Sequence, residues 1–218
     1  MVDPVPIDAA TTAAEFIPSS RSLRTLADAA QSCRGCPLYK RATQAVFGIG
    51  EKSARLMLIG EQPGDQEDLQ GAPFVGPAGK LLDECLEEAG IDRTDTYMTN
   101  AVKHFKHETR GKRRLHKKPS AREVNACRPW LERELEIVQP RVVLCLGATA
   151  AKALLGSTFR ITRQRGEWLE SEWSELTMAT FHPSAVLRVP TSEDRQRMRD
   201  TLVHDLKLAS ERAAEDAG

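Results

Sequence analysis

Four short segments typical of β-strands recur along the chain, and stretches with helical start and stop signals separate them. The segments are residues 55–59, 96–102, 141–147 and 176–181. A short apolar run that ends at glycine, as the first does at Gly60, is typical of a strand buried in a parallel sheet. Strands that alternate with helices predict an α/β fold with a doubly wound, mainly parallel four-stranded sheet flanked by helices.

The intervening helices are predicted from the residues that typically begin and end a helix. Ser22 can cap a helix that runs to about residue 31, and Pro77 begins a helix that ends at Gly90. Further helices are expected over residues 120–138, 148–155 and 191–212. Residues 61–76 hold three glycines and two prolines, so we expect an irregular loop there.

The length of 218 residues suits one α/β domain. Residues 1–20, with three prolines, look like a loosely attached N-terminal arm. The domain itself is expected over residues 21–212, and residues 213–218 form an acidic tail.

Charge is informative in its distribution rather than in its sum. The 31 Lys and Arg residues cancel the 31 Asp and Glu residues, which favours no class of partner. From Lys103 to Lys118, however, the sequence contains eight Lys or Arg residues and only one acidic residue, Glu108. Such a patch attracts phosphates, which predicts a nucleic-acid contact. The residues expected to bind DNA are Lys112, Arg113, Arg114 and Lys117.

Nothing in the sequence indicates export or a membrane. The first residues lack the basic and apolar regions of a signal peptide, and no apolar run approaches the ~20 residues of a membrane span. Five cysteines are an odd count, so a disulfide framework is not expected. We therefore expect a cytoplasmic protein, acting as a monomer.

The cysteines divide into two kinds. Cys85 shares a helix face with apolar residues and Cys145 lies inside a strand, so both are expected in the core. The Cys-x-x-Cys spacing is typical of a metal or cluster site, to which a cysteine on a later helix can contribute. The complete candidate set is Cys33, Cys36, His104 and Cys127. Three cysteines and one histidine suit structural zinc as well as an iron–sulfur cluster, and spacing alone leaves both open.

Three motifs fall where a doubly wound sheet places its site, just after strand ends. They are residues 60–68 together with 72–76, residues 99–102, and residues 181–184. Each motif alone is weak evidence for a functional site. An asparagine at a strand end is usually a turn residue, and a single histidine is structural as often as it is functional. Together they offer an aromatic ring, an amide and an imidazole. That set can stack a flat base, read its edge and stabilise negative charge on its oxygen.

The motifs, in order, resemble one family. Gly-Glu-x-Pro-Gly-x-x-Glu-Asp, Pro-Phe-Val-Gly-x-Ala-Gly, Asn-x-Val-Lys and His-Pro-Ser follow an N-terminal Cys-x-x-Cys, and the chain is similar to the iron–sulfur (family 4) uracil-DNA glycosylases over residues 33–206. The resemblance implies a [4Fe–4S] cluster. It also implies that Phe74 stacks a flipped uracil, Asn100 binds its edge, and His182 stabilises the anion that forms on O2. The remaining residues expected around the substrate are Gly60, Glu61, Gln62, Pro63, Gly64, Asp68 and Ser184.

Two departures narrow the resemblance to the X-type branch (UdgX). His104 stands where family members usually carry cysteine, and residues 111–116 form an enlarged basic loop with the Lys-Arg-Arg-aliphatic-His pattern. This similarity implies that His116 forms a stable covalent bond to the sugar after uracil has left, with Glu61 orienting or deprotonating the imidazole. Without the resemblance, His116 and its basic neighbours would simply grip phosphates.

The expected substrate is uracil-containing DNA, single-stranded at least as readily as duplex, because an unpaired base costs less to extract. Residues 67–71 are a candidate wall against the methyl group of thymine. Two alternatives stay open: a conventional multiple-turnover glycosylase that releases uracil, and a non-catalytic nucleic-acid-binding module with a structural metal.

Overall fold

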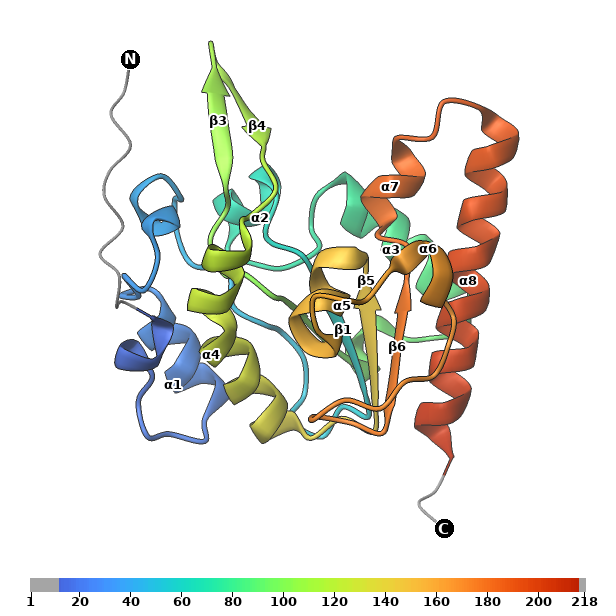
Figure 1. Cartoon of the computed structure of the whole chain (residues 1–218), viewed down its shortest axis with the longest axis horizontal. Coiled ribbons are helices and arrows are strands. Elements are labelled where there is room, and N and C mark those ends of the chain that lie inside the picture. Colours follow the sequence, from blue (N-terminus) through green and yellow to red (C-terminus); the bar gives the residue numbers. More distant parts are fainter. Residues whose placement is uncertain (1–11, 216–218) are drawn as a thin grey trace.

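A four-stranded sheet forms the centre of the computed structural model, which describes residues 12–215 (Figure 1). Its strands lie in the order β2-β1-β5-β6 and all pair in parallel. They are β1 (Leu56–Gly60), β2 (Thr96–Asn100), β5 (Val142–Leu146) and β6 (Leu176–Thr180). The predicted parallel α/β fold is therefore confirmed.

Helices cover both faces of the sheet, so its strands are almost wholly buried. On one face pack α3 (Pro77–Glu88) and α8 (Ser192–Ala214), whose buried residues join Leu58 and Leu144 in one cluster. On the other face lie α4 (Ala121–Val138) and α5 (Ala148–Leu155), which join the cluster around Met57 and Val143. Figure 1 shows α4 and α8 on opposite sides of the sheet.

The helix starts follow local chemistry. Ser22 caps α1 (Leu23–Ala30) by accepting a hydrogen bond from the Thr25 amide. Ser120 and Glu123 form a capping box at the start of α4. The shorter elements are η1 (Ala13–Phe16), η2 (Pro37–Lys40), η3 (Arg93–Asp95), α6 (Ile161–Gln164) and α7 (Pro183–Leu187).

Two segments expected to be irregular loops contain regular structure. Residues 61–76 include α2 (Asp65–Gln70), whose first turn carries three acids that favour a helix N-terminus. The basic loop is an antiparallel hairpin of β3 (His107–Arg110) and β4 (Arg113–His116). Gly111, at φ +60°, supplies the left-handed conformation of its turn. The hairpin projects from the body of the molecule (Figure 1).

Within the described range, the expected N-terminal arm packs on the domain. Ala13 is 1% exposed and lies in the cluster that includes Trp130 of α4. Arg133 of α4 also donates a hydrogen bond to the Ser20 carbonyl. Residues 1–11 of the arm and 216–218 of the expected tail lie outside the described residues. Among residues 12–215, no helix combines the length and apolarity needed to cross a membrane.

Candidate active site

The carboxyl edge of the sheet brings four of the expected residues together. Gly60 ends β1 and Asn100 ends the neighbouring β2, paired in register. A Cβ atom on Gly60 would lie 2.3 Å from Asn100 Oδ1 and 2.7 Å from Phe74 Cζ. The rings of Phe74 and His182 are 6.3 Å apart between centroids. An amide and an aromatic ring therefore adjoin a backbone that has no room for a side chain, and an imidazole lies beside the aromatic ring.

His182 is held as a neutral imidazole with a defined tautomer. Its Nδ1 accepts the Ser184 backbone N–H at 3.1 Å and lies 2.8 Å from Ser184 Oγ. Burial above all, and then the charges of Arg188 and His116, lowers the pKa of His182 to about 4. Because Nδ1 accepts the backbone N–H, the proton is placed on Nε2, which can donate to an oxyanion. Ser184 thus orients His182.

His116, at the end of β4, faces Glu61 at the end of β1. Its Nε2 lies 3.7 Å from Glu61 Oε1, and the other carboxylate oxygen of Glu61 accepts the Thr149 hydroxyl hydrogen bond. The His116 side chain is 49% exposed. Burial of its ring lowers the pKa of His116, while Glu61 opposes that shift, so the imidazole is neutral at pH 7. Thr149, on α5, carries no signal in the sequence.

The amide of Gln62 connects this histidine to the base of the hairpin. Gln62 Oε1 accepts the Lys106 backbone N–H at 3.1 Å, which fixes the amide orientation. Gln62 Nε2 contacts the carbonyls of Lys106 and Lys117 at 3.2 and 3.0 Å, and lies 2.9 Å from His116 Nε2. A donor facing Nε2 favours a lone pair on that nitrogen. Pro63, which follows Gln62, is buried.

Arg114 and Asp68, which are predicted to contact DNA and substrate, form an ion pair with each other. Arg114 lies 2.6 Å from both Asp65 and Asp68 of α2, and Asp68 also accepts the Thr43 amide. This ion pair fastens β4 to α2. Lys117 is paired with Glu108 across the hairpin at 2.7 Å.

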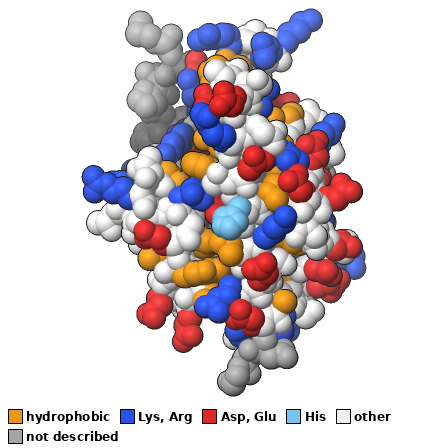
Figure 2. Space-filling model, turned by 90° about the vertical axis from the view of Figure 1, so that its right-hand side faces the viewer, with side chains coloured by type: hydrophobic (Ala, Val, Ile, Leu, Met, Phe, Trp, Pro, Cys, Tyr) orange, Lys and Arg blue, Asp and Glu red, His pale blue; other side chains and the backbone are white. Residues whose placement is uncertain are grey.

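The hairpin tip carries the cations that remain most exposed. Arg110, Lys112 and Arg113 are all exposed. Figure 2 shows Lys and Arg side chains along the upper rim of the molecule, whereas both signs are mixed over the face below. The tip is therefore the part of the predicted basic patch best placed to meet phosphates.

A buried ion pair behind Asn100 is a feature that the sequence motifs did not reveal. Lys103 donates to Glu134 of α4 and, at 2.8 Å, to the Asn100 carbonyl. Glu134 also accepts the Tyr97 and Thr99 hydroxyls and the Gly48 amide. Glu134 is 35 residues from Thr99 in sequence, so no local sequence motif predicts this hydrogen-bond network.

The candidate metal ligands are brought together in part. Cys33, Cys36 and Cys127 belong to one apolar cluster. Burial, and then the neighbouring Cys36, raises the pKa of Cys127 to about 12. The Lys103 backbone N–H donates to Cys127 Sγ at 3.2 Å, a bond that suits a cluster thiolate. Across residues 12–215, no three His, Cys, Asp or Glu side chains lie close enough to hold a metal ion. The chemistry of these side chains therefore fits an iron–sulfur cluster. In the described residues, however, the side chains are too far apart to bind one without moving.

Cys85 and Cys145 are fully buried, as expected for packing residues. His107, a neighbour of the candidate ligands in sequence, bonds the Arg41 carbonyl through Nε2 at 3.0 Å, and its buried Nδ1 has no partner within the described part of the chain.

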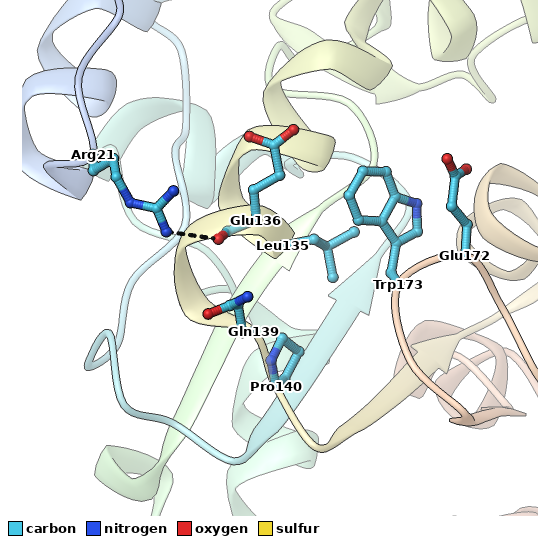
Figure 3. A pocket seen from close by; sticks show the side chains of 7 residues that line it. All are labelled: Arg21, Leu135, Glu136, Gln139, Pro140, Glu172 and Trp173. Carbon is cyan, nitrogen blue, oxygen red and sulfur yellow. Dashed lines mark hydrogen bonds between the residues drawn. The ribbon is translucent and has the colours of Figure 1, made fainter.

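Two hollows lie away from this edge. One, of about 410 Å³, has Pro140, which precedes β5, in its wall, together with Trp173 (Figure 3). In it Arg21 donates to the Glu136 carbonyl at 3.2 Å. The second, also about 410 Å³, is lined by Leu56 and Thr96, the first residues of β1 and β2. Both are at the amino ends of the strands, so neither contains a residue expected in the active site.

Comparison with known proteins gives one family. A model of the uracil DNA glycosylase superfamily matches residues 47–207. A Type-4 uracil-DNA glycosylase of Archaeoglobus fulgidus is 37% identical over 187 residues, 83% of this chain and 87% of the relative. One from Thermotoga maritima is 37% identical over 188 residues, 86% and 92% of the two chains. A Type-5 enzyme of Pyrobaculum aerophilum is 31% identical over 188 residues, 78% and 75% of the two chains.

Proposed function

The chain belongs to the uracil-DNA glycosylase superfamily, and from that premise we propose that it excises uracil from DNA and is then trapped on the abasic sugar by His116. The observation that carries excision is the meeting of Phe74, Asn100 and His182 around Gly60. The proposed substrate is single-stranded or duplex DNA that contains uracil.

Excision requires a flipped base and a stabilised leaving group. Phe74 stacks the uracil ring and Asn100 binds its polar edge. As the C1′–N1 bond breaks, its electron pair leaves with the base, and His182 Nε2–H donates to the developing oxyanion. The neutral state of His182 at pH 7 keeps Nε2 as a hydrogen-bond donor without a full charge. The carboxylate of Glu61 favours the cationic sugar.

Capture follows from the position of a neutral imidazole at the same edge. The His116 Nε2 lone pair attacks C1′ of the oxocarbenium ion and forms an N–C bond. The ring is then an N-alkylated imidazolium, whose one remaining N–H proton, on Nδ1, is lost to solvent, while the uracil anion takes up a proton from solvent. Glu61, which faces Nε2, orients the ring for the attack. The net products are neutral uracil and protein joined to DNA. The proximity of Glu61 and Gln62 to Nε2 supports this role for His116.

Conventional turnover is the competing function, and the relatives favour it because they are named Type-4 and Type-5 uracil-DNA glycosylases. In that case water attacks C1′, and the hairpin serves to hold DNA.

A denaturing gel with a uracil-containing single strand separates these functions, with a thymine strand as control. We expect a uracil-dependent band that survives heat and detergent, and one uracil released per protein. His116→Ala removes the band, whereas His204→Ala, a change at an exposed histidine on α8, leaves it. Excess free uracil without a band establishes the conventional enzyme. Unaltered DNA establishes a binding module, and a band in the His116→Ala variant places the nucleophile elsewhere.

The same proposal includes a [4Fe–4S] cluster held by Cys33, Cys36, His104 and Cys127. The gathering of three thiols and the amide bond to Cys127 support it. When bound, the cluster supplies a structural cross-link between the N-terminal segment and α4. The purified protein is expected to be brown and to contain about four iron and four sulfide ions per chain. One zinc ion and no visible absorption would identify a zinc site instead.

A further inference from the structure

Phe74 has a main-chain conformation that aromatic residues rarely adopt. Its φ is +55°, and Gln139 is the other non-glycine residue with positive φ among residues 12–215. The left-handed region is strained for a residue with a bulky side chain, so it persists only where the surroundings impose it. Three neighbours do so here.

Glu67 binds the main chain that follows Phe74. Its Oε1 accepts the backbone N–H groups of Val75 and Gly76 at 3.1 and 2.8 Å, and its Oε2 accepts that of Gly64 at 3.0 Å. Glu67 is 8% exposed. One buried carboxylate therefore joins the two loops that line the uracil pocket, with charge-assisted bonds that are stronger than neutral ones.

Arg93, which begins η3, binds the main chain on the other side. Its Nη1 donates to the Phe74 carbonyl at 3.2 Å and its Nη2 to the Pro73 carbonyl at 2.9 Å. The planar guanidinium thus holds two successive carbonyls at once. The side chain also pairs with Asp83 of α3.

The third constraint comes from α3. A Cβ atom on Gly79 would lie 1.9 Å from the Phe74 carbonyl oxygen, so the helix backbone itself presses against this peptide. The Phe74 ring is consequently directed at Gly60, where its Cζ lies 2.7 Å from the position of an added Cβ.

We propose that Glu67 and Arg93 are positioning residues that hold Phe74 in its left-handed conformation and so set the stacking platform for the uracil base. The inference rests on the proposed role of Phe74 in uracil excision. According to this proposal, Glu67 and Arg93 affect the rate of base excision and not the affinity for DNA.

The test compares Arg93→Met and Glu67→Gln with the matched controls Asp83→Asn and Glu87→Gln. Asp83→Asn removes the ion-pair partner of Arg93 but neither carbonyl bond, and Glu87 is an exposed carboxylate on α3. Single-turnover excision at saturating DNA is expected to slow by on the order of 100-fold in Arg93→Met and Glu67→Gln, as for a displaced reacting group. Affinity for a strand with a stable abasic analogue stays within about twofold of wild type, and Arg93→Lys restores part of the rate because one ammonium can hold one carbonyl.

Amide hydrogen exchange gives a readout that does not depend on catalysis. Peptides spanning residues 73–79 are expected to exchange faster in Arg93→Met and Glu67→Gln and unchanged in the controls. If wild-type protein excises uracil while both variants keep its rate and its exchange pattern, the positioning role is refuted. If wild-type protein removes no uracil, the proposed function fails, and unchanged exchange in the variants would refute the hold on the main chain independently.

Discussion

At the scale of single residues, the charge state of His116 decides whether it can act as the proposed nucleophile toward the sugar. Burial lowers its pKa below the ordinary 6.5, and only the neutral ring has a lone pair to donate. The second-order rate constant for adduct formation reports the free protein. We expect this constant to be highest at pH 8 and to fall toward acid with a midpoint below pH 6.5. A midpoint at or above pH 6.5, measured by quenched gel assays, would contradict the burial effect.

His182 titrates still lower and links pH to stability. Its folded pKa of about 4 lies below the unfolded value, so the unfolded chain binds more protons between these two values. The stabilisation that comes with the neutral ring is therefore complete above pH 6.5 and is lost as pH falls toward 4. We expect His182→Gln to flatten the fall in melting temperature between pH 6.5 and 4. An unchanged slope in thermal scans would show that His182 is not buried as a neutral group.

Gly60 is a position where one methyl group should be decisive. A Cβ there would meet both Asn100 Oδ1 and the Phe74 ring at less than 3 Å. Gly60→Ala therefore displaces the two side chains proposed to hold the base, and excision is expected to slow by on the order of 100-fold. Single-turnover release of labelled uracil measures the rate. Wild-type speed in this variant would place the uracil elsewhere.

At the scale of elements, the hairpin depends on its ion pair with α2. Arg114→Met leaves Asp68 buried without its cation, at a cost of about 2 kcal/mol, which corresponds to a fall of roughly 4–8 °C in melting temperature. Because β4 carries His116, the adduct yield should fall while uracil release continues. Arg110→Met, at an exposed position on the same hairpin, serves as the control. An undiminished adduct yield in Arg114→Met would mean that this anchor does not position His116.

The elements that sequence could predict are those specified locally. Strands β1 and β5 are apolar runs, and β2 and β6 are short segments that mix apolar residues with threonine. Ser22, Pro77 and Ser120 stand at helix starts, where their side chains act on nearby backbone. The hairpin was missed because Lys and Arg fill the segment and Leu115 alone marks an apolar position. Its form depends on Gln62 and Arg114, whose partners lie 44 to 55 residues away.

The site divides in the same way. Asn100, Gly60 and His182 follow from the rule that parallel strands present their carboxyl ends at one edge. This rule does not identify three other residues of the site, Thr149, Arg93 and Glu134. Each acts through a partner that is distant in sequence; Thr149 and its partner Glu61 are 88 residues apart. No sequence pattern shows that Asp68 and Arg114 pair with each other, because the two residues are 46 positions apart.

At the scale of the whole molecule, the balance of charge bears on the affinity for DNA. Several cations of the basic segment are paired internally, so few remain for phosphates. Replacing Lys112 and Arg113 by alanine should lower the salt dependence of single-strand binding by about 1.4 in the logarithmic slope, about 0.7 for each lost phosphate contact. Titrations with a thymine strand at several salt concentrations measure it. An unchanged slope would show that the tip does not touch DNA.

The two ends of the hairpin segment meet at its base, where the Lys117 N–H donates to the Lys106 carbonyl at 3.0 Å. Because its two ends are adjacent, this hairpin segment can be lengthened, shortened or exchanged without a change in the strand order of the central sheet. In the proposed function, base removal belongs to residues at the sheet edge, whereas bond formation to the sugar belongs to His116 on this hairpin segment. If His116 forms the proposed bond, the two activities are carried by separable segments, and grafting the hairpin segment onto a turnover enzyme of the same family would give a reagent that marks uracil in DNA permanently.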